Sequence, residues 1–72
     1  MKMYTKEEAM IIYNCTQISD NFKDRVKSNF YEDRQKINER KKYIIDHIKR
    51  TLIRFPKIET ELQKMISELT LI

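Results

Sequence analysis

The chain has 72 residues, of which 36% are charged and 40% hydrophobic, and its formal net charge is +4. It has no glycine and one proline, which disfavours tight turns that need positive φ and glycine-rich phosphate loops. The composition therefore predicts a single all-α domain, residues 1–72, whose small core supplies only a few kcal/mol of net stability.

A capping box predicts where the first helix begins. Thr5 is followed three residues later by Glu8, the spacing at which each side chain can accept a hydrogen bond from the backbone of the other. The polar run 19–21 could cap a further helix, so the first helix is expected over about 5–17. Its buried face would carry Tyr4, Ile11, Cys15 and Ile18.

A long apolar stripe predicts one central helix over about 20–55, roughly 50 Å long at 1.5 Å per residue. A break around 28–33 is the alternative, because residues 31–42 contain only Tyr31 and Ile37 as apolar side chains. The shared phase of the stripe favours an unbroken helix, since an inserted loop would preserve it only by chance. At ~100° per residue, an arc of roughly 80° holds Phe22, Val26, Phe30, Ile37, Ile44, Ile48 and Phe55.

Pro56 is expected to end this helix, because the residue before a proline is pushed out of helical geometry. A third helix over about 57–70 follows, and its apolar face would carry Ile58, Leu62, Met65, Ile66, Leu69 and Ile72. Two short flanking helices could cover only the ends of a 50 Å helix. The exposed middle suggests an antiparallel homodimer through Ile37 and its neighbours.

Positive charge is concentrated in the middle of the chain. Residues 34–54 hold eight basic and two acidic side chains, whereas the segments on either side are slightly acidic. Such a surface can attract nucleic acid, anionic lipid or an acidic protein. Six side chains spaced alternately by four and three residues form a second stripe, termed the basic stripe: Lys36, Arg40, Tyr43, His47, Arg50 and Arg54.

The basic stripe is the candidate partner-binding site. Its arginines can fork to phosphate or carboxylate, and Tyr43 can stack on a base or fill a protein pocket. A solvated helix face without a partner is the plain alternative. No helix-turn-helix, zinc-finger or RNA-binding signature accompanies the stripe, so an acidic protein surface is the favoured partner and nucleic acid the second. Membrane binding is disfavoured, because acids outnumber lysines on the polar side of the third helix.

No motif indicates catalysis, a metal or a cofactor. His47 is the only histidine, and Cys15, the only cysteine, is expected to be a buried apolar group, so a zinc site is not expected. No nucleophile and base occur at a telling spacing, and we expect no enzymatic activity. Neither a signal peptide nor a membrane span is recognisable, which makes the cytoplasm the expected location.

In size, lack of glycine and abundance of lysine and isoleucine, the chain resembles small accessory proteins of AT-rich bacteria and their phages. The expected function is non-enzymatic binding of a larger macromolecule, as an inhibitor or adaptor that occludes a surface. The basic stripe would steer the encounter and Tyr43 would supply contact area. A nucleic-acid-binding protein that uses the same stripe on phosphates is the competing hypothesis, and a bundle component without a separate ligand is the third.

Overall fold

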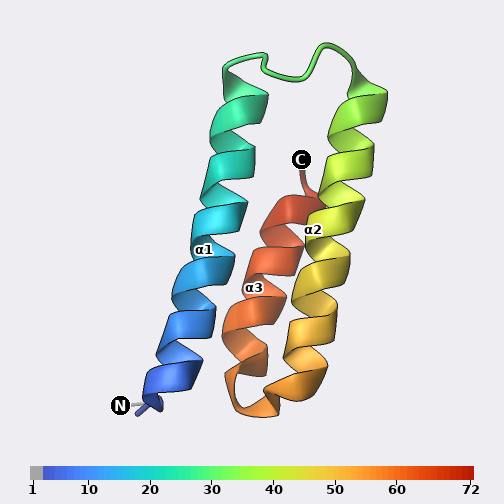
Figure 1. The fold of residues 1–72 in the computed structure, drawn as a ribbon. Helices are drawn as coiled ribbons and strands as arrows, with labels where there is room; N and C mark the ends of the chain where they lie inside the picture. The colour runs from blue at the N-terminus through green and yellow to red at the C-terminus, as the bar shows by residue number, and fades with distance from the viewer. Residues whose placement is uncertain (1–2) are drawn as a thin grey trace.

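The computed structural model describes residues 3–72, in which the chain forms three α-helices and no strand. The prediction of an all-α fold is confirmed for this part of the chain. Helices α1 (Lys6–Lys27) and α2 (Arg34–Arg54) form an antiparallel hairpin, and α3 (Glu59–Thr70) runs back beside them after a 3₁₀ turn, η1 (Pro56–Ile58). Figure 1 shows α3 against the half of the hairpin nearer to the N-terminus.

Helix α1 begins at the predicted capping box. The Thr5 hydroxyl accepts a hydrogen bond from the Glu8 N–H at 3.1 Å, and the Glu8 carboxylate accepts one from the Thr5 N–H at 2.9 Å. The expected end of this helix near residue 17 is wrong, because α1 continues to Lys27. Ser19 belongs to the capping signal expected there, but it is 2% exposed inside the helix. Burial of one continuous face of α1 therefore overrides the preference of serine for a helix N-terminus.

The long central helix predicted over 20–55 is also wrong, because the chain leaves helical geometry at residues 28–33. The Phe30 N–H donates to the Arg25 carbonyl at 2.9 Å, which is the long hydrogen bond of a Schellman motif. Asn29 occupies the left-handed position of this motif with a φ of 59°. Asparagine is the residue that most often replaces glycine there, because its short polar side chain tolerates this conformation.

Helix α2 starts afresh after this connection. The Asp33 carboxylate caps it by accepting a hydrogen bond from the Lys36 N–H at 2.9 Å. The apolar stripe keeps its phase across the break because Phe22 on α1 and Ile44 on α2 both face the same core. The same spacing of apolar residues is therefore compatible with two helices that pack against each other and with one long helix.

The end of α2 agrees with the role expected of proline. Helical geometry stops at Phe55, which has φ and ψ of −131° and 70°, and Pro56 opens the 3₁₀ turn that leads into α3. Together, η1 and α3 cover residues 56–70, close to the range 57–70 expected for the third helix. The tight turn lays α3 directly against α2.

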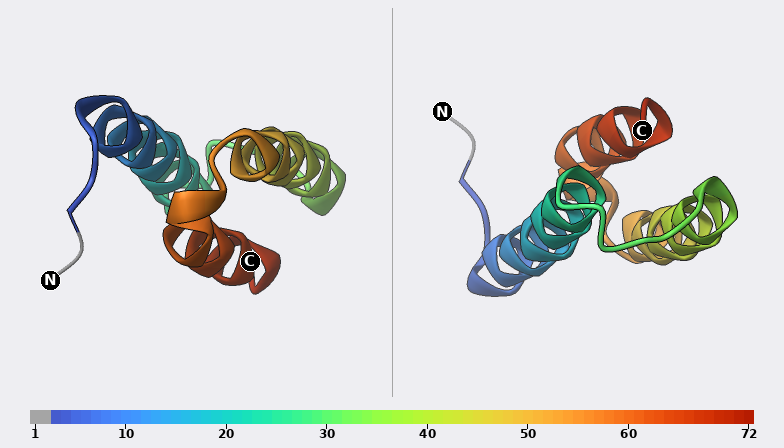
Figure 2. Two further views of the ribbon diagram at one scale, coloured as in Figure 1. Left: turned by 90° about the horizontal axis from the view of Figure 1, so that it is seen from below. Right: turned by 90° about the horizontal axis from the view of Figure 1, so that it is seen from above.

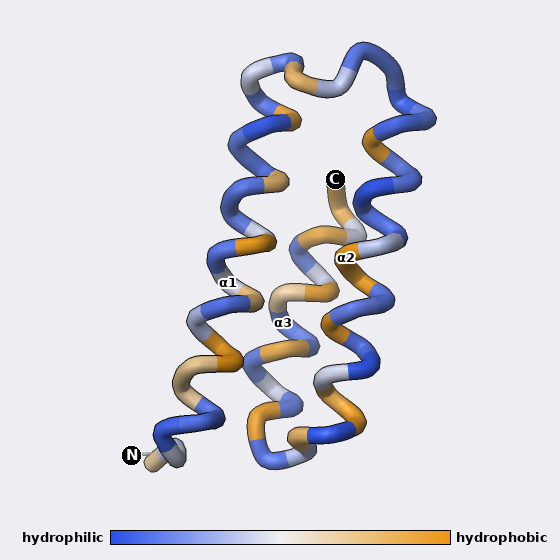
Figure 3. Tube along the Cα trace, viewed as in Figure 1, coloured by the Kyte–Doolittle hydropathy of each residue, from blue (hydrophilic) through white to orange (hydrophobic). Residues whose placement is uncertain are grey.

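A hydrophobic core joins the three helices. Figure 3 shows apolar positions on the sides of the helices that face one another. Half of the buried core comes from η1 and α3, so these 15 residues hold the hairpin together. The core side chains that are exposed by 8% or less are Cys15, Phe22, Ile44, Ile48, Ile58, Leu62, Ile66 and Leu69.

Polar contacts fasten α3 to the N-terminal part of the chain. The Lys23 Nζ lies 2.8 Å from the Glu68 Oε2, and this ammonium holds the pKa of the Glu68 carboxyl below its usual range. Near the other end of α3, the Tyr4 hydroxyl donates to the Glu61 carboxylate, and that hydrogen bond raises the pKa of Tyr4. Both contacts lie at the surface, so they orient α3 more than they stabilise it.

The antiparallel homodimer was predicted from a long helix with an exposed middle, and the hairpin has no such helix. No 50 Å helix with an exposed middle exists among residues 3–72, and Ile37 packs against the core of its own chain. Homodimerisation itself stays a prediction. Within the same residues, no helix has the combination of length and apolar character needed to cross a membrane.

Two substitutions of one residue type on α2 test where the core lies. Ile48 is 0% exposed and Ile53 is 77% exposed. We expect Ile48→Val to lower the free energy of unfolding by about 1 kcal/mol, because it removes a buried methyl group. Ile53→Val should change it by less than about 0.5 kcal/mol. Urea unfolding followed by circular dichroism measures both, and equal effects would contradict this placement of the core.

The break at Asn29 predicts a definite order of stability between two variants. In the left-handed conformation, Asn29→Gly should be about 1 kcal/mol more stable than Asn29→Ala, because only glycine lacks the Cβ that opposes positive φ. In a continuous helix the order would be reversed by about 1 kcal/mol, since alanine is the better helix former. Denaturant unfolding of the two variants gives the sign, and a more stable alanine variant would refute the break.

Candidate functional site

The basic stripe lies entirely on α2, and all six of its side chains are exposed. Helix α2 turns its apolar face, centred on Ile44 and Ile48, into the core, where these residues are 2% and 0% exposed. The stripe is offset from that face by about a quarter-turn, so it emerges along the edge of the hairpin. Its position on the helix surface is therefore fixed by the burial of the neighbouring stripe.

A groove runs along the hairpin beside the basic stripe, between α1 and α2. It consists of three adjoining hollows of about 310, 180 and 110 Å³. The first two share His47, and the last two share Ile18, Arg40 and Ile44, so the hollows follow one another along the hairpin. Among residues 3–72, none from α3 lines it, and the end-on views of Figure 2 show α3 on one side of the pair formed by α1 and α2.

The groove has an apolar floor between two mixed walls. Helix α2 supplies one wall from four members of the basic stripe: Arg40, Tyr43, His47 and Arg54. Helix α1 supplies the other wall: Glu7, Met10, Asn14, Asn21 and Arg25. The floor between them is made by Ile11, Cys15, Ile18, Phe22, Ile44 and Phe55.

The other two members of the stripe lie outside the groove lining. The Lys36 Nζ is 3.7 Å from the Glu32 carboxylate, and the Arg50 Nη2 is 3.0 Å from the Asp46 carboxylate. These are exposed pairs one helical turn apart, a kind that stabilises a helix by only a few tenths of a kcal/mol. The six predicted residues therefore divide into four that line the groove and two that pair locally.

The arginines of the groove stack on aromatic rings. The Arg40 guanidinium lies 5.2 Å from the centre of the Tyr43 ring, and the Arg54 guanidinium lies 5.6 Å from that of Phe55. Within residues 3–72, neither guanidinium has a carboxylate partner. Stacking leaves the N–H groups in the plane of a guanidinium available, so both can still bind an anion.

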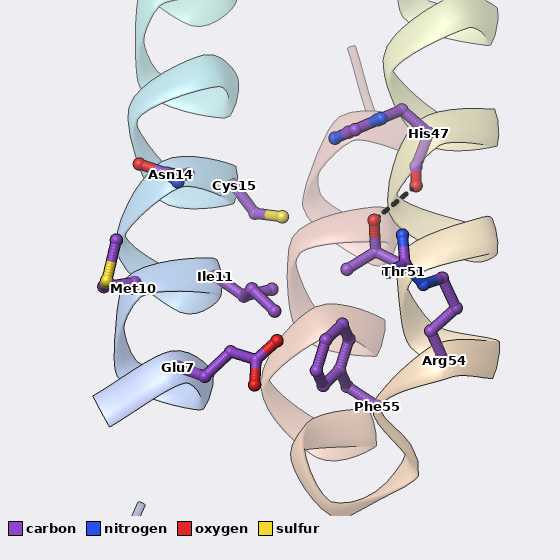
Figure 4. A pocket seen from close by; sticks show the side chains of 9 residues that line it. All are labelled: Glu7, Met10, Ile11, Asn14, Cys15, His47, Thr51, Arg54 and Phe55. Carbon is purple, nitrogen blue, oxygen red and sulfur yellow. Dashed lines mark hydrogen bonds between the residues drawn. The ribbon is translucent and has the colours of Figure 1, made fainter. Parts of the chain in front are cut away.

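The largest of the three hollows in the groove lies near the N-terminal end of α1. Figure 4 shows Ile11 and Cys15 projecting from α1 toward α2, and Thr51 donating a hydrogen bond to the His47 carbonyl at 2.9 Å. Met10 at its rim is 56% exposed, and Tyr43 farther along the groove is 62% exposed. Because Met10 and Tyr43 are already at the surface, a ligand can cover both side chains without any change in the core.

Cys15 belongs to the floor and is 2% exposed, as expected for a buried apolar group. Burial raises the pKa of its thiol, which lowers the fraction of reactive thiolate. Among residues 3–72, no group of three histidine, cysteine, aspartate or glutamate side chains could hold a metal ion.

The α1 side of the groove, wall and floor residues together, was not predicted from the sequence, although a pattern for it is present. Glu7, Ile11, Asn14, Ile18, Asn21 and Arg25 follow one another at intervals of four, three, four, three and four residues. These are the intervals of the basic stripe itself. Two lines of side chains with the same spacing, one on each helix, can contact a common ligand. That they lie side by side is known only once the hairpin is known.

Comparison with known proteins finds no protein family, no characterised protein and no solved structure that matches this chain. Its function must therefore be inferred from the residues of the groove and their surroundings.

The burial of Cys15 predicts slow alkylation. We expect iodoacetamide to modify the native protein at least about tenfold more slowly than the urea-unfolded protein at the same near-neutral pH, because the thiolate is disfavoured and shielded. Mass spectrometry over time measures both rates. Equal rates would show that the floor of the groove is open to solvent.

Proposed function

We propose that this chain is a non-enzymatic binding protein that engages an acidic surface of a larger protein through the basic side of α2. Occlusion of that surface would make it an inhibitor or adaptor. The observation that carries the proposal is one groove that combines an apolar floor with Arg25, Arg40 and Arg54, which have no carboxylate partner within residues 3–72. Cations beside apolar area are the composition of a protein-binding surface.

Electrostatic steering supports the same proposal. Helix α2 carries eight basic and two acidic side chains in 21 residues, so its solvent side is strongly positive. A field of this kind accelerates the encounter with an acidic partner and disfavours a basic one. The exposed Tyr43 ring would then supply apolar contact once the partner has docked.

Nucleic acid is the second candidate, favoured by a different part of α2. Lys41, Lys42 and Lys49 line a hollow of about 320 Å³ outside the groove, and they extend the positive surface around the helix. Such a surface could neutralise several phosphates, and its affinity would then fall steeply with salt. A phosphate backbone would, however, leave the apolar floor of the groove uncovered, which is why an acidic protein is favoured.

The proposed location is the cytoplasm, where a reducing environment suits the free thiol of Cys15. A catalytic role is not proposed. His47 is exposed on the wall of a groove open to solvent, and among residues 3–72 no hydroxyl or thiol donates a hydrogen bond to its imidazole. That surrounding offers neither the enclosure nor the paired groups of nucleophilic catalysis.

A matched pair of charge reversals tests the proposal. Arg40→Glu with Arg54→Glu alters the groove, and Lys42→Glu with Lys49→Glu makes the same change in net charge on exposed positions outside it. In affinity capture from nuclease-treated host lysate, we expect the wild type and the lysine variant to retain a protein partner. The arginine variant should retain at least about tenfold less, because the partner's carboxylates lose their counter-charges.

Circular dichroism of both variants checks that the helices are intact. Equal retention by all three proteins, or equal loss in both variants, would contradict a role for the groove. Capture of a partner only from lysate that has not been treated with nuclease would move the function to nucleic acid.

A further inference from the structure

We infer that the groove between α1 and α2 receives one amphipathic helix of the partner, which packs along the hairpin as a fourth helix and places acidic side chains against Arg25, Arg40 and Arg54. This inference rests on the proposed function and specifies the kind of acidic surface that is bound. Helix-in-groove recognition of this kind uses apolar anchors at intervals of three and four residues, with charges on the flanks.

The shape of the groove fits a single helix. Its two walls are antiparallel helices, and the lines of side chains that border it have alternating intervals of four and three residues on both. The opposite side of the same hairpin is already filled in this way by α3, an amphipathic helix whose Leu62, Ile66 and Leu69 are buried. The hairpin therefore packs one helix on one side and offers the other side open.

The length of the groove sets the length of its occupant. The α1 wall extends from Glu7 to Arg25, which corresponds to about 27 Å at 1.5 Å per residue. A helix that fills the groove would thus have about 18 residues, or five turns. Its apolar side would cover the partly exposed Ile11 and Ile18, above the buried Ile44, together with the exposed parts of the rim.

The charges of the lining select an acidic helix and place its acids. Arg25 and Arg40 border the same hollow at one end of the groove, and Arg54 borders the hollow at the other end. Arg40 and Arg54 are separated by about 21 Å along α2. The matching partner helix carries carboxylates near both of its ends, about four turns apart, and apolar residues between them.

A second copy of this chain is a poor occupant by comparison. The groove lining has three arginines and one carboxylate, Glu7, so two grooves brought together would oppose like charges. Because arginines lie at both ends of the groove, two copies would bring arginines of one groove against arginines of the other in either a parallel or an antiparallel arrangement. Charge complementarity thus favours an acidic helix from another protein.

Designed peptides test this inference without knowledge of the natural partner. The probe is an 18-residue helical peptide with leucines at intervals of four and three residues and glutamates on both flanks. One control replaces every glutamate by lysine, and another places a proline at the centre of the acidic peptide. We expect the acidic peptide to bind at least about tenfold more tightly than either control, measured by fluorescence anisotropy, because both charge and helical shape are recognised.

Methyl NMR of the same complex locates the peptide. The acidic peptide should shift the resonances of Ile11, Ile18 and Ile44 in the groove and leave Ile12 and Met65, which line the separate hollow between α1 and α3, nearly unchanged. Shifts confined to the α1–α3 hollow, failure of the acidic peptide to bind, or equal binding of the lysine peptide would each overturn the inference.

A pair of tyrosines provides a matched test that leaves the core untouched. Tyr43 lines the groove and Tyr13 does not, and both are 62% exposed. Tyr43→Ala should weaken binding of the acidic peptide by about tenfold, whereas Tyr13→Ala should change it by less than about twofold. Equal effects of the two substitutions would contradict a groove-bound helix.

The outcomes separate this inference from the proposed function. If the lysate partner depends on Arg40 and Arg54 but the acidic helical peptide does not bind in the groove, the binding function stands and the bound surface is not a helix. If the peptide binds in the groove while the captured partner is indifferent to both arginines, the groove accepts helices but is not the site of that partner. If neither depends on the groove, both proposals fail.

Discussion

The left-handed turn at Asn29 is the constraint on which the rest of the structure depends. With Asn29 at a φ of 59° and the Phe30 N–H bonded to the Arg25 carbonyl, the chain cannot continue as a helix. Helix α2 must then run back beside α1, and only that arrangement gives α3 two helices to pack against. The same turn converts the basic stripe from an isolated line of side chains into one wall of a groove.

The two sides of the hairpin differ in what covers them. On one side, α3 buries its apolar face, and the Lys23–Glu68 pair fastens its edge. On the other side, Arg40 and Arg54 lie over neighbouring rings above an apolar floor, and neither has a carboxylate partner within residues 3–72. A small domain with one completed side and one open, charged side is suited to bind another chain, since a partner helix would add both apolar burial and counter-charge.

Local signals in the sequence were sufficient for several elements. The capping box at Thr5, the stop at Pro56 and the burial of Cys15 each depend on a few neighbouring residues, and each agrees with the structure. The long helix failed because apolar period alone cannot distinguish one helix from two that face a common core. Asn29, in a chain without glycine, was the signal for the break. The α2 half of the groove could be predicted, whereas the α1 half depends on tertiary packing.

The most direct test of this account is a nuclear Overhauser contact between the ring of Phe22 and the δ1 methyl of Ile44. These residues belong to one buried cluster and line one hollow, so the hairpin predicts a clear cross-peak in the free protein. In a continuous helix over 20–55 they would lie about 33 Å apart, far beyond the reach of this measurement. Observation of the cross-peak in a monomeric sample supports the hairpin and the groove, and its absence would contradict both.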